Sequence, residues 1–416
     1  MRRPAARWRI GWGLAALLAA CSPSSHPGPA APAPLMPPPS QAPILAPAQG
    51  EIIGSGPVRV ALILPLSGNT ASVGRAMANG ARLGMDHVAE RGSQTIHLVL
   101  KDGGATTQSA RAAAQQAVAE GARLILGPLT ADAVAMAGAI AKPAGIPLIG
   151  FSSTASVATD GVYLLSVLPE AEVMRALGHA RMAGRRAVAA ILPDTPLGRV
   201  QAEVLRQAAS ELGLTVVGVE MFDSEDRART AIERLAPAMR SGQIDTLYLP
   251  DRATAPSFGL LLDAARVPRD RLMLIGSAEW EGDAAILRQP YLAGALYPAI
   301  DPAGLAALAP RYRARFGSEP HQLATLAFSA VLLANSPGLS QSVPPYGNGL
   351  LAPGGFVGRD GSFRFHFDGR GEYGLVIRQV GPEGATTIEA ARLGGLPLAA
   401  LGGGTDAGIP PAAEYR

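Results

Sequence analysis

Cysteine is nearly missing from this chain: among its 416 residues there is only one, Cys21. The sequence beyond it therefore offers no disulfide, no thiolate metal site and no cysteine nucleophile. The six histidines show no metal-binding spacing such as H-E-x-x-H. We expect neither a metal nor a cofactor, so packing alone must stabilise the fold.

The chain also lacks a strong charge of either sign. Its 36 Lys and Arg against 33 Asp and Glu leave a net charge of +3, and no run of five like charges occurs. Nucleic-acid partners require a basic patch, so we expect no nucleic-acid partner. Neither G-x-x-x-x-G-K-[ST] nor G-x-G-x-x-G after a strand is present, so a nucleotide would find no phosphate cradle.

The N-terminus has the layout of a bacterial export signal. Four arginines precede ten apolar residues over 11–20, and the segment LAAC that ends at Cys21 resembles the lipobox of bacterial lipoproteins. A stretch of ten residues is too short to cross a bilayer, which takes about 20 helical residues, so we expect residues 1–20 to be removed as a signal peptide. The resemblance implies a lipid on Cys21, and Ser22 behind it implies sorting to the inner leaflet of the outer membrane.

A long segment after Cys21 lacks the residues of a folded core. From residue 22 to residue 50 it has ten prolines and no Asp, Glu, Lys or Arg. Pro-rich chains extend to about 3.1 Å per residue, so these 29 residues reach at most roughly 90 Å. We predict a lipidated, Pro-rich tether over 21–56 that holds the folded body away from its membrane.

From residue 57 onward, short apolar runs alternate with Ala-rich stretches of helical period. Strands that are apolar throughout, each followed by a helix, are typical of parallel sheets covered on both faces. The helices expected over 108–120 and 197–212 each have one apolar face at 3.6-residue spacing. The predicted strands cover residues 58–66, 96–101, 123–127, 146–150, 187–193, 215–222, 245–250 and 272–276.

These strands form two series, which predicts an α/β protein of two doubly wound parallel-sheet lobes. The second series begins with a helix near residue 170. Asp360-Gly361 and Asp368-Gly369 favour tight hairpin turns, so we predict a C-terminal β-hairpin region within 356–380. The Gly- and Pro-rich end over 396–416 is predicted to be a flexible tail.

Several segments resemble, in the same order, the type I periplasmic binding proteins of the leucine-binding group. They are VRVALILPLSGNTASVGRAMANGARLG over 58–84, ILGPLT over 125–130 and GIPLIG over 145–150. The resemblance covers about residues 57–395 and implies a three-stranded hinge, with crossings near residues 168, 298 and 342. Lobe 1 is then expected to comprise 57–168 and 298–342, and lobe 2 to comprise 169–297 and 343–395.

Ligands of open α/β sheets bind beyond the carboxyl ends of the strands, so the loops there form the predicted cleft. The resemblance implies that Ser152 and Thr154 contact a ligand and that Glu279 supplies an acid from the second lobe. The chain departs from the family at Ala131 and Leu197, where a serine and an aromatic residue are expected. The predicted cleft residues are Ser67, Gly127, Thr130, Ser152, Ser153, Thr154, Asp194, Asp251 and Glu279.

One segment approaches a hydrolase motif. The sequence GFSST over 150–154 follows a predicted strand and is close to the G-x-S-x-G nucleophile elbow. Its fifth residue is Thr154, where the tight turn of the elbow needs glycine. We therefore interpret these hydroxyl groups as ligand contacts and predict a binding protein, not an enzyme.

Two functions remain open. The tail segment FVGRDGSFRF over 356–365 resembles outer-membrane lipoproteins that activate penicillin-binding proteins. This favours a regulator of peptidoglycan synthesis whose partner is a peptidoglycan synthase. The alternative is a leucine or branched-chain amino-acid-type substrate-binding protein, which passes an amino-acid-like ligand to an ABC permease. Both functions predict a lipid-anchored periplasmic protein.

Overall fold

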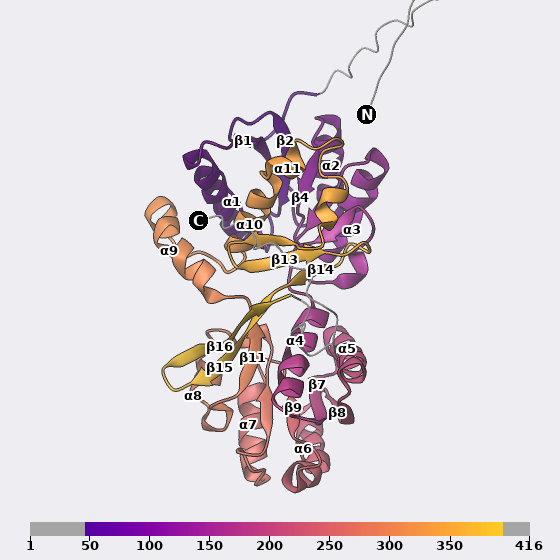
Figure 1. Cartoon of the computed structure of the whole chain (residues 1–416), viewed down its shortest axis with the longest axis vertical. Coiled ribbons are helices and arrows are strands. Elements are labelled where there is room, and N and C mark those ends of the chain that lie inside the picture. Colours follow the sequence, from indigo (N-terminus) through magenta and orange to yellow (C-terminus); the bar gives the residue numbers. More distant parts are fainter. Residues whose placement is uncertain (1–45, 394–416) are drawn as a thin grey trace, which may run out of the picture. The chain divides into compact units, whose positions relative to one another are not determined.

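The computed structural model describes residues 46–393 (Figure 1). The predicted signal peptide over 1–20, the lipidation at Cys21 and the predicted tail over 396–416 lie outside these residues, as does the tether up to residue 45. Within the part of the chain that is described, no helix is both long enough and apolar enough to span a membrane.

The first lobe contains a six-stranded sheet with the order β1-β3-β2-β4-β5-β6. Its neighbouring strands run parallel, except that β1 pairs antiparallel with β3 at one edge. A helix follows each of β2, β3 and β4, as in a doubly wound sheet. The elements are β1 (Glu51–Ile53), β2 (Val58–Leu64), α1 (Ala71–Glu90), β3 (Ile96–Asp102), α2 (Thr107–Ala119), β4 (Leu124–Leu126), α3 (Ala131–Ala141), η1 (Lys142–Ala144), β5 (Leu148–Gly150), η2 (Ala155–Val157) and β6 (Val162–Leu164).

The second lobe contains a seven-stranded sheet with the order β16-β15-β11-β10-β9-β7-β8. Strands β7 to β11 run parallel, and β15 and β16 are antiparallel additions at one edge. The two lobes confirm the predicted α/β architecture (Figure 1). The elements are α4 (Pro169–Met182), β7 (Ala187–Pro193), α5 (Pro196–Leu212), β8 (Thr215–Phe222), α6 (Glu225–Ser241), β9 (Thr246–Tyr248), α7 (Ala255–Ala264), β10 (Met273–Ile275), η3 (Ala278–Trp280), α8 (Ala284–Arg288), η4 (Pro290–Leu292), β11 (Leu296–Ala299), β15 (Leu375–Gly381) and β16 (Gly384–Arg392).

Local sequence signals set the ends of the helices. Thr106 and Thr195 precede α2 and α5, and the side-chain oxygen of each accepts a hydrogen bond from a backbone amide of the first turn. Helix α5 ends at Gly213, which adopts the left-handed conformation that terminates many helices. The helices predicted over 108–120 and 197–212 are confirmed as α2 and α5.

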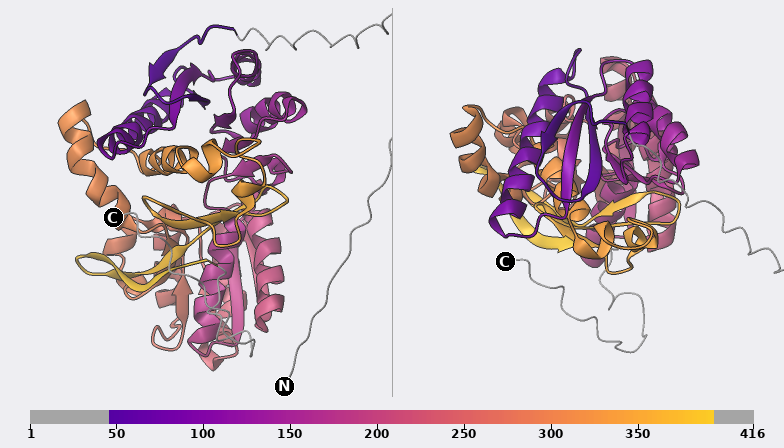
Figure 2. Two further views of the ribbon diagram at one scale, coloured as in Figure 1. Left: turned by 45° about the horizontal axis from the view of Figure 1, so that its top comes forward. Right: turned by 90° about the horizontal axis from the view of Figure 1, so that it is seen from above.

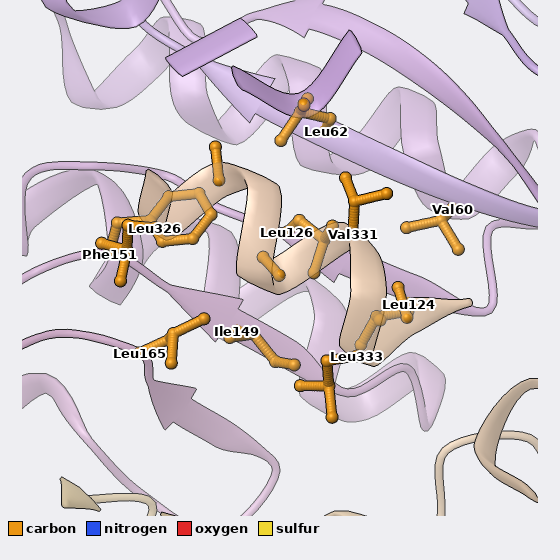
Figure 3. Close-up of a cluster of buried hydrophobic side chains, with 14 of the residues drawn as sticks. Val60, Leu62, Leu124, Leu126, Ile149, Phe151, Leu165, Leu326, Val331 and Leu333 are labelled. Atoms are coloured by element: carbon orange, nitrogen blue, oxygen red, sulfur yellow. The ribbon is translucent and has the colours of Figure 1, made fainter. Parts of the chain in front are cut away.

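A helix from late in the chain completes the core of the first lobe. Helix α10 (Ala324–Ala334) packs beside α1, and the two are orange and indigo in Figure 2. Leu326 and Val331 of α10 share one buried cluster with Leu62 and Leu126 of the sheet (Figure 3). Full burial of such a side chain contributes about 1.5–3 kcal/mol, so these contacts hold distant parts of the sequence together.

The chain passes between the lobes three times. The first crossing lies between β6 and α4, and the second between β11 and α9 (Pro302–Phe316), close to the expected residues 168 and 298. The third, which the resemblance places near residue 342, lies instead at Gly374, between β14 (Gly371–Tyr373) and β15.

Residues 343–373 therefore pack on the first lobe and not, as the resemblance implies, on the second. The core of the first lobe includes three aromatic side chains of this region: Phe363, Phe365 and Tyr373. The amide of Leu164 on β6 also donates to the carbonyl of Gly369 at 2.9 Å. Both predicted hairpin turns are present in this region, which contains α11 (Pro337–Ser340), η5 (Asn348–Leu351), β12 (Phe356–Gly358), β13 (Gly361–Phe365) and β14.

Residues 46–56, expected in the tether, are likewise part of the first lobe. Strand β1 pairs with the edge strand β3, and the amide of Ala46 donates to the carbonyl of Ala119 at 3.2 Å. Lys101 and Glu120 form a buried ion pair with Nζ and Oε1 2.9 Å apart. This pair holds Gln49, whose carbonyl accepts from Lys101 and whose amide donates to Glu120.

Candidate functional site

Loops at the carboxyl ends of β2, β3 and β4 surround a hollow in the first lobe. Its volume is about 100 Å³, and its polar lining includes Thr70, Thr107, Thr130 and Asp132. Among the predicted cleft residues, Thr130 is the one that lines this hollow. The hollow therefore offers hydroxyl groups to a small polar molecule, at the edge of the sheet where α/β proteins bind their ligands.

Gly127 shapes the loop that carries Thr130. Its φ is +88°, and a Cβ at this position would lie 2.0 Å from the carbonyl oxygen of Ile63. Glycine alone fits so close to β2 in this conformation. The amide of Gly127 donates to the carbonyl of Ile149 at 2.7 Å and so ties the loop to β5. Gly127 thus positions the rim of the first lobe.

The loop after β5 has three hydroxyl side chains, of which one forms a hydrogen bond within the loop and two are exposed. Ser152 is buried, and its Oγ accepts a hydrogen bond from the amide of Thr154 at 3.1 Å. Ser153 and Thr154 have exposed side chains. The amide of Phe151 donates to the carbonyl of Pro128 at 2.8 Å, so this loop lies beside the loop of Thr130. Ser153 and Thr154 are accessible to a ligand, and Ser152 maintains the shape of the loop.

A carboxylate at the end of β3 adds negative charge to the first rim. Oδ1 of Asp102 accepts hydrogen bonds from the amides of Leu66 and Gly104 at 2.9 and 2.7 Å. Burial raises the pKa of Asp102, but hydrogen bonds from the Gly104 amide and the Ser67 hydroxyl outweigh it and hold this pKa below its ordinary value. Ser67, a predicted cleft residue, is exposed and engaged with Asp102, which the sequence analysis does not single out.

The predicted acids of the second lobe differ in their surroundings. Asp251, after β9, accepts from the amide and hydroxyl of Thr254 at 3.0 and 2.5 Å and so shapes the turn before α7. Asp194, after β7, is exposed and forms an ion pair with Arg199. Glu279 lies in η3 and is exposed, with no ion pair to any residue within 46–393. Glu279 is therefore the predicted acid that is available to a ligand.

A partly buried carboxyl group for which the sequence gives no signal lies beside Glu279. Glu172, in the first turn of α4, accepts a hydrogen bond from the amide of Ala278 at 3.4 Å. Burial raises the pKa of Glu172 to about 7 against the lowering effect of the Ala278 amide, and the charge of Glu279 adds to the rise. Acids are common in the first turn of helices, where the helix dipole favours them, so Glu172 does not stand out in the sequence.

A buried phenol accompanies these two carboxylates. Tyr248, the last residue of β9, is 1% exposed, and its hydroxyl has no hydrogen-bond partner among the described residues. Burial, together with the charges of Glu172 and Glu279, raises the pKa of Tyr248 well above its ordinary value. A tyrosine in an apolar strand is typical of a core, which is why the sequence contains no signal for this group.

Residues 57–336, more than half of the chain, match the family described as periplasmic binding protein. The chain belongs to the periplasmic binding protein family. Among curated protein sequences, none matches this chain. The matched span runs from β2 to α10, so it includes the second lobe to the end of β11 and leaves out β1, residues 343–373 and the strands β15 and β16.

Solved periplasmic binding proteins share the fold. A protein from Rhodospirillum rubrum assigned as a branched-chain amino acid ABC transporter has 21% sequence identity and a TM-score of 0.70 over 80% of this chain and 99% of that chain. An ABC transporter substrate-binding protein from Desulfitobacterium hafniense, in complex with Leu, has 17% identity and a TM-score of 0.58 over 81% of this chain and 99% of its own. A solute-binding protein of an ABC transporter from Rhodopseudomonas palustris BisB5, in complex with 3,4-dihydroxy benzoic acid, has 17% identity and a TM-score of 0.56 over 81% and 97% of the two chains.

The description of this family, periplasmic binding protein, refers to binding and not to catalysis. In this member, Oγ of Ser152 accepts a backbone hydrogen bond, whereas His179 and His366 contact Glu389 and Glu372 at 2.5 and 3.2 Å. Within residues 46–393, no group of three His, Cys, Asp or Glu side chains could hold a metal ion. Hydroxyl groups and carboxylates on the two rims can form hydrogen bonds with a ligand.

Proposed function

We propose that this chain is the substrate-binding component of an ABC transporter, with a small amino-acid-like ligand and an ABC permease as its partner. The observation that carries the proposal is the pair of polar rims at the carboxyl ends of the two sheets. One rim has the hydroxyl groups of Thr130, Ser153 and Thr154, and the other has the carboxylate of Glu279. Hydroxyl groups can donate to a carboxylate, and a carboxylate can accept from an ammonium group.

The structural relatives support transport more than activation of a synthase. They are described as ABC transporter proteins, and one of them is in complex with Leu. None of the structural relatives named above is described as an activator of a penicillin-binding protein. Transport therefore becomes the first proposal.

The export signal and Cys21 support a further part of the proposal, namely that the protein is lipidated and works in the periplasm. The lipid would keep the binding protein at a membrane while its lobes sample ligand. Metabolic labelling with a radioactive fatty acid tests this point. Wild-type protein should carry the label and Cys21→Ser should not. Equal labelling of the two would contradict lipidation at Cys21.

A thermal-shift screen with the twenty common amino acids tests the transport proposal. A ligand at 100 times its Kd stabilises the folded state by about 2.7 kcal/mol, which raises Tm by several degrees. The double variant Ser153→Ala with Thr154→Val should reduce the shift caused by the best ligand, because both side chains are exposed on the rim. The control Thr230→Val, at an exposed position of α6, should keep the full shift. A panel with no shift at all would contradict the proposal.

One observation favours a second candidate function, activation of a penicillin-binding protein. The 24 residues between Cys21 and Ala46 include nine prolines, and Ser22 suits sorting to the outer membrane. A regulator anchored in the outer membrane needs a long segment of this kind to reach its partner. It would accelerate a synthase only by binding the active conformation more tightly than the resting one. Glycan polymerisation by a purified peptidoglycan synthase, measured with and without this protein, tests the idea, and an unchanged rate contradicts it.

A further inference from the structure

Arginines gather at the end of the second lobe that is opposite its rim. This end is formed by the last turns of α4 to α7 and by the loops that lead into β7, β8, β9 and β10, over residues 183–186, 213–214, 242–245 and 265–272. Figure 1 shows α6 and α7 there, away from the first lobe. We call this end the basic pole; its arginines are Arg181, Arg185, Arg186, Arg240, Arg266, Arg269 and Arg271.

Backbone carbonyls hold some of these arginines in place. Arg181 and Arg240 donate to the carbonyls of Leu212 and Ala265 at 3.2 and 2.9 Å, at the C-terminal ends of α5 and α7. The helix dipole favours a cation at such an end. A guanidinium group has five N–H donors, and each of these two arginines uses one of them, so both keep donors for a further partner.

Three other arginines of the basic pole have no polar partner in the described part of the chain. The side chains of Arg186, Arg266 and Arg271 are exposed, and their guanidinium groups form no hydrogen bond or ion pair within residues 46–393. Arg266 also has a φ of +54°, the left-handed conformation that glycine adopts most easily after a helix. Arginine thus occupies a strained backbone position although its charge has no partner in the fold, which points to a partner outside it.

The acids of the basic pole do not neutralise its charge. None of the seven arginines forms an ion pair within residues 46–393. Asp245 instead accepts hydrogen bonds from the amides of Arg186 and Ala187 at 2.8 and 3.2 Å. Burial lowers the pKa of Arg269, and the charge of the neighbouring Arg185 lowers it further, so these two cations repel each other. The other acids of the pole are Glu211, Asp263 and Asp270.

The opposite end of the same lobe has the opposite charge. Its rim loops contain one arginine, Arg252, which pairs with Asp283 at 3.7 Å. Arg199 and Arg227, in the first turns of α5 and α6, likewise pair with acids of these loops. The acids of the rim loops are Asp194, Asp223, Asp251, Glu279, Glu281 and Asp283. A negatively charged surface would therefore orient this lobe with the basic pole toward it.

We propose that the basic pole is a docking surface for the anionic headgroups of a phospholipid bilayer. The arginines come from successive helix ends and loops, and this spread matches an extended anionic surface. The inference goes beyond the proposed function, because contact at the pole leaves the candidate site at the other end of the lobe free. The lipid proposed on Cys21 would keep the pole within reach of such a surface.

The side chains of the basic pole favour a bilayer over a protein partner. Its loops expose no large hydrophobic side chain, because Leu214, Ile244, Val267 and Leu272 are all buried. Protein interfaces usually centre on apolar and aromatic side chains, whereas adsorption to headgroups needs charge alone. Each arginine close to an anionic bilayer strengthens binding about fivefold, so the three arginines without a partner should together contribute about 100-fold.

Co-sedimentation with lipid vesicles tests the basic pole. The exported chain with Cys21→Ser is the protein to use, because a lipid on Cys21 would bind to every vesicle. We expect it to bind vesicles of phosphatidylglycerol and phosphatidylcholine in equal parts at about 0.05 M NaCl, and to bind them at least about tenfold more weakly at about 0.3 M NaCl, where salt screens the charges. Vesicles of phosphatidylcholine alone should not bind it.

A matched pair of triple variants locates the contact. Arg186→Gln with Arg266→Gly and Arg271→Gln removes the three arginines without a partner, so it should keep the Tm of wild type. It should bind the phosphatidylglycerol vesicles at least about tenfold more weakly. The control removes the same charge from exposed ion pairs of α5 and α6 and should bind as wild type does. The control variant is Arg206→Gln with Arg227→Gln and Arg229→Gln.

Several results would overturn the inference. They are equal binding to the two kinds of vesicle, full binding by the first triple variant, or an equal loss in the control variant. Poly-L-glutamate represents the other occupant, an acidic protein surface. If the chain binds this polymer and not the phosphatidylglycerol vesicles, the partner is not a bilayer. None of these results depends on a ligand between the rims, so the proposed function is tested separately.

Discussion

Asp360 provides a test of how burial controls charge in this protein. The residue lies in the turn between β12 and β13 and is 2% exposed. Its carboxylate contacts Gly304 in the first turn of α9. Burial raises the pKa of Asp360 from 3.8 to about 6, although the Thr325 hydroxyl and the Arg359 guanidinium lower it. The substitution to examine is Asp360→Asn, which removes the charge and keeps the size.

The sign of the effect follows from the raised pKa. The folded state binds the proton of Asp360 more tightly than the unfolded state, so the stability from this group is present below the unfolded pKa and is lost as the pH rises through about 6. The rise of about two pKa units corresponds to a loss of about 3 kcal/mol at pH 7.5 and about 1 kcal/mol at pH 4.5. Asp360→Asn should therefore be more stable than wild type by up to about 3 kcal/mol at pH 7.5, and by about 1 kcal/mol at pH 4.5.

Urea unfolding at the two pH values measures this difference. Asp270→Asn, at an exposed position, is the control and should match wild type at both. The opposite result is also informative: a carboxylate at the N-terminus of a helix is favoured by the helix dipole. If Asp360→Asn is less stable than wild type at pH 7.5, stabilisation by α9 exceeds the effect of burial, and the reasoning is refuted.

Two further substitutions test the packing of the first lobe by chemical denaturation. Gly127→Ala should reduce the free energy of unfolding by about 3 kcal/mol or more, because its Cβ would lie 2.0 Å from the Ile63 carbonyl oxygen. Gly242→Ala, at a positive φ with open space around it, should lose only about 1–2 kcal/mol. Equal losses in the two variants would contradict this reasoning. Lys101→Met should lose about 3–5 kcal/mol, because it leaves Glu120 buried without its partner. Adding Glu120→Leu should restore most of this loss, and a double variant as unstable as Lys101→Met alone would argue against the buried charge as its cause.

Elements governed by local signals could be predicted from the sequence. The apolar run of β2 and the helical spacing of apolar residues in α2 and α5 give these elements within one or two residues of their observed bounds. The lobe to which residues 343–373 belong could not be predicted in this way. It depends on which core Phe363 and Phe365 pack into. The hairpin turns determine how β12, β13 and β14 pair with one another, but they do not determine the lobe on which these strands pack. Strand β1 is too short for its period to be recognised.

The residues of the candidate site could likewise be predicted from the sequence only in part. Position at the end of a strand identifies Ser153, Thr154 and Glu279 as rim residues, because the carboxyl ends of parallel strands meet at one edge of a sheet. The same position says nothing about neighbours, so the hydrogen bond that holds Ser152 within its loop is visible only in three dimensions. Glu172 is the clearest example. It reaches Glu279 across more than a hundred residues of sequence, and only the packing of α4 against η3 brings the two together.

The central claim is that the rims of the two sheets hold a small amino-acid-like molecule. Native mass spectrometry of the full chain with individual amino acids counts bound molecules directly. We expect one bound molecule per chain for at least one amino acid, with binding reduced in the Ser153→Ala and Thr154→Val double variant and retained in Thr230→Val. Chains that remain empty with every amino acid, or that bind several molecules equally in all three proteins, would contradict it.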